Sequence, residues 1–138
     1  MRRFLRLVTL WLWGGAIYWC VEMAWRGHSH WTMFIVGGLC FLLLGGINNW
    51  LAWRLGLVWQ ALIGAAVVTA VELVAGVVLN LGLGMRIWDY SRMWGNLLGQ
   101  ICLPFAIAWI PLSVAGIVLD DYLRYVLYGE QKPKYALL

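Results

Sequence analysis

The sequence predicts an all-α fold, namely a polytopic membrane protein built as a bundle of four transmembrane helices. The first observation is composition: 64% of the 138 residues are hydrophobic and 12% are charged, whereas a soluble domain carries about 25% charged residues. The second is the recurrence of apolar runs near or above the roughly 20 residues that a helix needs to cross a bilayer. The third is the placing of Trp near the ends of these runs, where amphipathic rings prefer to lie. The expected solvent is therefore the lipid bilayer.

The apolar runs define the four helices in order. The first covers residues 4–24, and the polar stretch RGHSHW joins it to the second, which covers 31–53. The third covers 57–83, and the turn before it is so short that the second and third helices should form an antiparallel hairpin. The fourth covers 97–119 and follows the longest connector, GMRIWDYSRMWGN.

One domain, residues 1–128, holds these helices, and residues 129–138 form a polar tail that is expected to be frayed. Basic residues near the ends of the spans predict the orientation, because Lys and Arg concentrate in cytoplasmic segments. With both termini in the cytoplasm, the cytoplasmic side holds Arg2, Arg3, Arg6, Arg54, Arg124, Lys132 and Lys134, and the outer side holds Arg26, Arg86 and Arg92. Asp120 and Asp121 are then interpreted as solvated charges where the fourth helix leaves the membrane.

Small residues interrupt the spans. Paired glycines occur at Gly14–Gly15, Gly37–Gly38 and Gly45–Gly46. Between helices in lipid there is no hydrophobic driving force, so small residues that let backbones approach closely favour packing. The pattern predicts a tight bundle, and the narrow interior of a single bundle suggests a homo-oligomer.

Glu72 lies well inside the third span, in TAVELVAG. An acidic residue at the centre of a membrane helix costs about 2.5–3.5 kcal/mol on insertion scales, so it needs a partner, a proton or water. We interpret Glu72 as a substrate or ion site. The alternative is a structural carboxyl group that fixes helix packing.

A second set of polar residues is predicted at the outer ends of the helices. Glu22 and Arg26 are four residues apart, so they can form an ion pair on one helix face. His28 and His30 follow in the loop and are candidate metal ligands, since imidazole binds divalent metals. The alternative for both histidines is an interfacial polar side chain.

The connector RIWDYSRMWGN is expected to fold over the mouth of the bundle. In that arrangement Asp89 reaches an Arg or a His, and Trp88 lies at the lipid boundary. Tyr90, Asn96 and Gln100 extend the polar cluster. The predicted substrate or ion site therefore consists of Glu72, Glu22, Asp89, Tyr90, Asn96, Gln100 and Arg26.

Other chemistries have little support in the sequence. The cysteines form no CxxC or Cys/His pattern typical of zinc, and no motif indicates a cofactor. Nucleic-acid binding is not expected, because no basic stripe carries interleaved aromatics.

The stretches VELVAGVVLNLGLGMRIWDYS and GNLLGQICLPFAIAW resemble the family described as putative ABC-transporter type IV, and the resemblance covers about residues 18–125. The upstream segment EMAWRGHSHWTMFIVGGLCF, with Glu22 and Gly37–Gly38, resembles a short subgroup of the family. The matching positions are Glu72, Gly76, Trp88, Asp89, Tyr90, Ser91, Asn96, Gly99, Cys102 and Leu103. The resemblance implies a permease-like protein of a bacterial inner membrane. Because the sequence has no P-loop, an ATPase would be a separate subunit.

Three functions remain open at this point. The first is a small transporter or permease-like subunit with an intramembrane acidic site that opens to the outer side. The second is a non-catalytic scaffold or accessory subunit of a membrane complex, in which the polar cluster only maintains the fold. The third is an intramembrane metal-dependent enzyme, although the sequence favours a protein that is not an enzyme.

Overall fold

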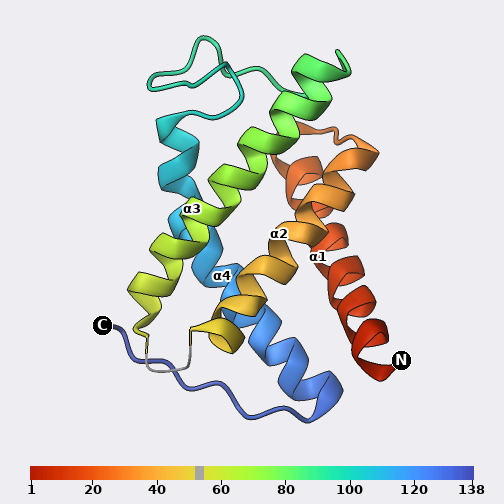
Figure 1. Cartoon of the computed structure of the whole chain (residues 1–138), viewed down its shortest axis with the longest axis vertical. Helices are drawn as coiled ribbons and strands as arrows, with labels where there is room; N and C mark the ends of the chain where they lie inside the picture. The colour runs from red at the N-terminus through yellow and green to blue at the C-terminus, as the bar shows by residue number, and fades with distance from the viewer. Residues whose placement is uncertain (52–54) are drawn as a thin grey trace.

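The computed structural model describes residues 1–51 and 55–138, and within these residues it contains four α-helices and no strand (Figure 1). They are α1 (Arg2–Arg26), α2 (Trp31–Trp50), α3 (Leu57–Gly76) and α4 (Leu103–Tyr128), and a π-helical turn, η1 (Val77–Gly82), extends α3. Each is apolar and long enough to cross a membrane. Both termini lie at one end of the bundle, and the connector between η1 and α4 lies at the other. The predicted fold class is confirmed.

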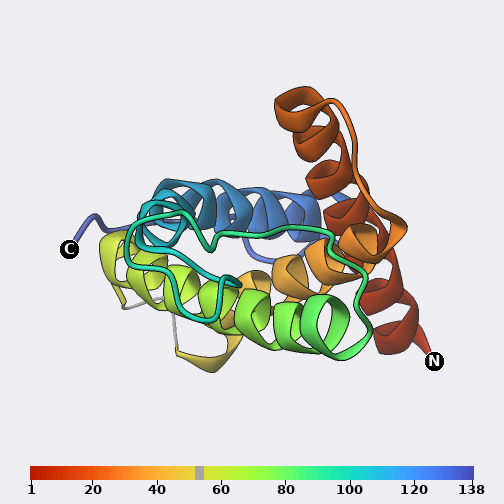
Figure 2. The same ribbon diagram turned by 90° about the horizontal axis from the view of Figure 1, so that it is seen from above.

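Helix α1 packs along α2 through paired glycines. A Cβ atom added to Gly38 of α2 would lie 2.5 Å from the carbonyl oxygen of Trp11, and one added to Gly15 of α1 would lie 2.6 Å from that of Phe34. The two backbones are therefore in direct contact, as small residues permit in lipid. Figure 2 shows α1 at one side of the bundle, away from α3.

Helices α2, α3 and α4 enclose the main apolar core, which contains Leu44, Ile47, Val68 and Ile117. Gly64 of α3 makes room for Leu44 of α2, since a Cβ atom there would lie 2.7 Å from the Leu44 side chain. This three-helix unit fixes the position of α4 relative to α3.

The first three spans lie close to their predicted ranges, although the predicted end of the second, near residue 53, falls outside the described residues. The fourth, predicted at 97–119, instead runs from Leu103 to Tyr128. Leu98 and Gly99 adopt positive φ angles of 54° and 68°, which no α-helix accommodates. The helix starts only after this turn, with proline at its beginning, where the missing N–H is no loss.

The tail is ordered against the bundle, so the expectation that it is frayed is wrong. The carbonyl oxygens of Ala136 and Leu137 accept hydrogen bonds from the N–H groups of Leu57 (2.8 Å) and Val58 (3.2 Å) at the start of α3. These are donors that a helix leaves unpaired at its N-terminus. The tail therefore caps α3.

Asp120 and Asp121 are not solvated charges, contrary to the sequence interpretation, because their exposed fractions are 0% and 5%. Asp120 accepts a hydrogen bond from Arg124 (2.5 Å), and Asp121 accepts hydrogen bonds from Asn48 (2.6 Å) and Tyr135 (2.7 Å). Helix α4 continues past the predicted end of its span, so both carboxylates lie between helices and under the tail.

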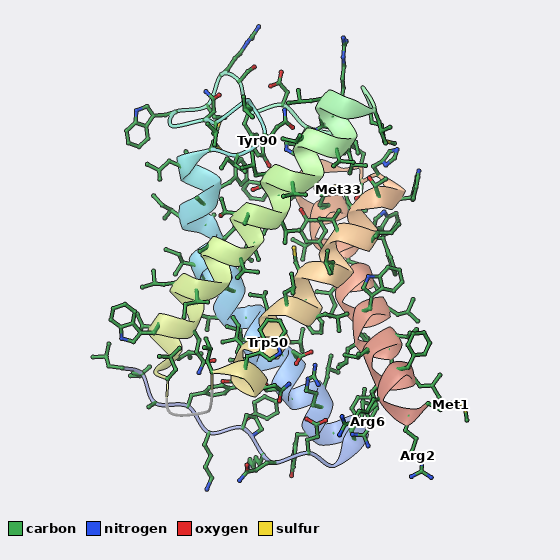
Figure 3. All side chains as sticks on the ribbon, viewed as in Figure 1. Met1, Arg2, Arg6, Met33, Trp50 and Tyr90 are labelled. Atoms are coloured by element: carbon green, nitrogen blue, oxygen red, sulfur yellow. The ribbon has the colours of Figure 1, made fainter. Side chains whose placement is uncertain are left out.

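At the same end, α1 contacts the end of α4 through Arg6, which is labelled in Figure 3. Its guanidinium lies 4.9 Å from the centre of the Tyr128 ring and 3.6 Å from the Glu130 carboxylate. The contact is largely exposed, so it contributes little stability on its own.

Replacing Gly38 by Ala should destabilise the fold, because the added methyl group meets backbone rather than a mobile side chain. Overpacking of this kind costs about 1–3 kcal/mol. The free energy of unfolding, measured by denaturant titration in detergent micelles, should fall by that amount. Leu39→Ala is the matched control, because the Leu39 side chain is 45% exposed on the outer surface of the same helix. Equal stability of Gly38→Ala and the wild type would contradict the backbone contact.

Candidate functional site

Glu72 lies on α3 at the junction with α4 and the connector, with an exposed fraction of 9%. Its Oε1 atom accepts a hydrogen bond from the Tyr90 hydroxyl (3.0 Å), and its Oε2 atom accepts one from the Trp109 indole N–H (3.0 Å). Tyr90 belongs to the connector and lies between the upper ends of α3 and α4 (Figure 3), whereas Trp109 belongs to α4. The Glu72 carboxylate therefore joins three segments.

Aromatic rings surround this carboxylate. The Tyr90 ring stacks on Phe105 with centroids 4.9 Å apart, and Tyr18 of α1 stacks on Trp109 at 6.4 Å. Burial, reinforced by the nearby Glu72 charge, raises the pKa of Tyr90 above its ordinary value. The phenol thus remains protonated and is a hydrogen-bond donor at neutral pH.

Asn80 of η1 anchors the connector. Its Nδ2 atom donates to the Trp88 carbonyl (3.1 Å) and to Gln100 Oε1 (2.8 Å), and its Oδ1 atom accepts from the Ile87 N–H (2.7 Å). Asn80 is 7% exposed and Gln100 4% exposed. The π-helical turn, a feature frequent at functional sites, presents this amide to both arms of the connector.

Trp88 does not lie at the lipid boundary, as the sequence interpretation proposed. Its exposed fraction is 7%, and its indole N–H donates to the Gln100 carbonyl (2.9 Å). Buried Trp side chains usually satisfy their N–H in this way. Trp94, 75% exposed, is the connector tryptophan on the surface.

Asp89 and Asn96 shape the turn. Asp89 accepts from the Ser91 N–H (2.8 Å), which lowers the pKa of its exposed carboxyl group. It forms no ion pair with an Arg or His of the described residues, contrary to expectation. Asn96 donates to the carbonyls of Ser91 (3.2 Å) and Met93 (3.0 Å). Neither side chain reaches Glu72.

A second polar cluster lies where the end of α1 and the first loop meet the start of the connector. Glu22 forms the predicted ion pair with Arg26 (3.2 Å) and accepts a hydrogen bond from Ser29 (2.6 Å). Arg26 also donates to the Ile87 carbonyl (3.1 Å), which ties the first loop to the connector. These groups line a cavity of about 230 Å³ together with His28, His30, Met85 and Arg86. Glu72 does not line it, so the predicted polar residues form separate clusters.

The two histidines have local roles. His30 lies at the N-terminus of α2, where its ring accepts from the Thr32 N–H (3.3 Å), and the His28 ring lies 3.1 Å from the Arg26 carbonyl. Within residues 1–51 and 55–138, no three His, Cys, Asp or Glu side chains are grouped as metal ligands would be.

Of the predicted site residues, the structure joins Glu72 to Tyr90, and Glu22 to Arg26. Trp109, which donates to Glu72, was not among the residues predicted for the site. An indole N–H inside an apolar span was the available signal, because this donor also needs an acceptor in lipid.

Replacing Asn80 by Ala should release the connector. Three hydrogen bonds of about 0.5–1.5 kcal/mol each are lost, so trypsin should cleave after the exposed Arg86 and Arg92 at least about tenfold faster in nanodiscs. Val78→Ala is the control, because Val78 is a surface residue of the same turn. Unchanged cleavage in Asn80→Ala would show that the amide does not hold the connector.

Comparison with known proteins places this architecture in a family. The family model described as putative ABC-transporter type IV matches residues 9–129. This range includes η1, the connector, and the buried acidic residues Glu22, Glu72, Asp120 and Asp121. No curated protein and no solved structure matches the chain. Since the match covers most of the 138 residues, the chain belongs to the putative ABC-transporter type IV family.

Proposed function

We propose that the chain is a small membrane transport protein in which Glu72 binds and releases a proton that enters from the connector end. The carrying observation is that Glu72 lies inside a membrane helix, and its hydrogen-bond donors in the described structure, Tyr90 and Trp109, are neutral. The carboxylate is thus solvated by the protein, but its charge is not neutralised by a cation there.

The magnitudes support a group that can change its protonation state. Inserting an acidic residue at the centre of a membrane helix costs about 2.5–3.5 kcal/mol, and a hydrogen bond to a charged group contributes about 1.5–3 kcal/mol. Two such bonds are comparable to the insertion cost. The protein therefore offsets the cost of a charged Glu72, so that a carboxylate able to release its proton can exist at this position.

The geometry also supports access from the connector side. Tyr90 is half-buried in a loop at the end of the bundle and contacts Glu72 directly. Movement of the connector would expose Glu72 without any change in the helix core. We propose that this side is the outside, with both termini in the cytoplasm of a bacterial cell whose inner membrane holds the protein.

The second candidate function is an accessory subunit of a larger transporter. It is favoured by the hydrogen bonds that Glu72 accepts from α4 and the connector, because these bonds would also hold the segments together in a protein without transport activity. The sequence contains no P-loop, so an ATP-driven complex would take its ATPase from another subunit. The chain would then stabilise a complex, as a homo-oligomer or with that subunit.

Glu72→Gln should abolish proton uptake, because the amide keeps the size of the side chain but does not bind a proton near neutral pH. The measurement uses purified protein in liposomes that contain the pH dye pyranine, with a potassium–valinomycin gradient to set the membrane potential. Wild-type vesicles should acidify, and Glu72→Gln vesicles should behave like protein-free vesicles.

The control for this experiment is Glu130→Gln, which removes an acidic residue from the opposite end of the bundle, where Glu130 pairs with Arg6. It should transport like the wild type. Wild-type uptake that persists in Glu72→Gln would reject the role of Glu72, and absence of uptake in the wild type would leave the accessory function as the better account.

Tyr90→Phe should slow proton uptake roughly tenfold without abolishing it, since one hydrogen bond to a charged group contributes about 1.5–3 kcal/mol and Trp109 remains. The rate is read from the same dye assay. Tyr122→Phe is matched to it, because that ring lies 42% exposed on the surface of α4. A normal rate in Tyr90→Phe would mean that the hydroxyl takes no part in proton transfer.

A further inference from the structure

At the end of the bundle that holds both termini, a buried polar cluster has more hydrogen-bond acceptors than donors. Asp120 uses Oδ2 to accept from Arg124, and Asp121 uses Oδ2 to accept from Asn48 and Tyr135. The Oδ1 atoms of Asp120 and Asn48 are fully buried and have no hydrogen-bond partner in the described part of the chain. A buried acceptor without a partner costs about 1–3 kcal/mol, so two of them in one cluster require an explanation.

Packing brings these groups together between α2 and α4. The Asp120 carboxylate lies directly over Gly45, where an added Cβ atom would overlap it. Asn48 is one turn further along the same face of α2, and it holds the adjacent Asp121. Asn48 is 4% exposed. Its amide nitrogen donates to Asp121, whereas its amide oxygen is buried without a partner in the described residues.

We propose that Asn48, Asp120 and Asp121 form a binding site for a monovalent alkali cation, Na⁺ or K⁺. Carboxylate and amide oxygens are the ligands of hard cations. Two carboxylates and one guanidinium leave the cluster one negative charge in excess, which a single monovalent charge balances. A divalent ion would leave the cluster with one positive charge in excess, so it is disfavoured.

The tail covers this site. Tyr135 donates to the Asp121 oxygen that also binds Asn48, and the residues after it cap α3. A cation held by Asp120 and Asp121 therefore stabilises the packing of α2, α4 and the tail together. Its binding should appear as thermal stability of the whole protein, since a ligand that binds only the folded state raises the unfolding midpoint.

The test is thermal unfolding of the full chain in nanodiscs, followed by tryptophan fluorescence. Solutions of NaCl, KCl, MgCl₂ and choline chloride are compared at equal ionic strength. NaCl or KCl should raise the unfolding midpoint by a few degrees over choline chloride, and the shift should saturate with concentration. The shift should vanish in Asp120→Asn and persist in Glu130→Gln, which removes an acidic residue at the same end of the bundle.

Several results would overturn the proposal. One is an equal midpoint of the wild type in NaCl, KCl and choline chloride, which would mean that a proton or water occupies the cluster. Another is a larger shift with MgCl₂ than with either monovalent salt. A third is a cation shift that is lost in Glu72→Gln and kept in Asp120→Asn, which would place the ion at Glu72. Because the wild type alone decides the first two outcomes, a variant that fails to fold does not prevent the test.

Discussion

Polar groups inside this bundle depend on the protein for hydrogen-bond partners, because hydrocarbon offers none. Asn80 shows how strongly this requirement organises the connector end: one amide satisfies a backbone N–H, a carbonyl and the Gln100 side chain. The polar connector in an otherwise apolar chain is thereby explained. Its residues complete the hydrogen bonding of η1 and of Glu72, and Trp88 closes the arrangement from inside rather than from the lipid.

The helices were predictable because their signal is average hydropathy over about 20 residues, which no local detail alters. The start of α4 was not, because Leu97 and Leu98 are as apolar as the helix that follows. What ends the connector is backbone geometry: Leu98 and Gly99 take positive φ angles, and Leu97 and Ile101 form an isolated antiparallel bridge. Gly99 is compatible with such a turn, because glycine adopts positive φ angles without steric cost. The leucine side chain at position 98 gives no such indication.

The candidate site divides in the same way. Glu72 was identifiable because an acidic residue within a long apolar run is rare, and Tyr90 because the connector had to cover it. Asp120 and Asp121 were misassigned, since position near the end of a run does not reveal which face of a helix is covered. Gly45 of α2 leaves space for the Asp120 carboxylate of α4. The sequence shows the glycine but does not show which side chain fills that space.

The two ends of the bundle use the same device. At one end Tyr90 of the connector donates to Glu72, and at the other Tyr135 of the tail donates to Asp121. Each segment covers a buried carboxylate and is held to it by a phenol. A carboxylate that gains a proton becomes a weaker acceptor, because charge-assisted hydrogen bonds are about twice as strong as neutral ones. Under the proposed function, protonation of Glu72 therefore loosens the connector that covers it, and this couples occupancy of the site to its access without movement of the helix core.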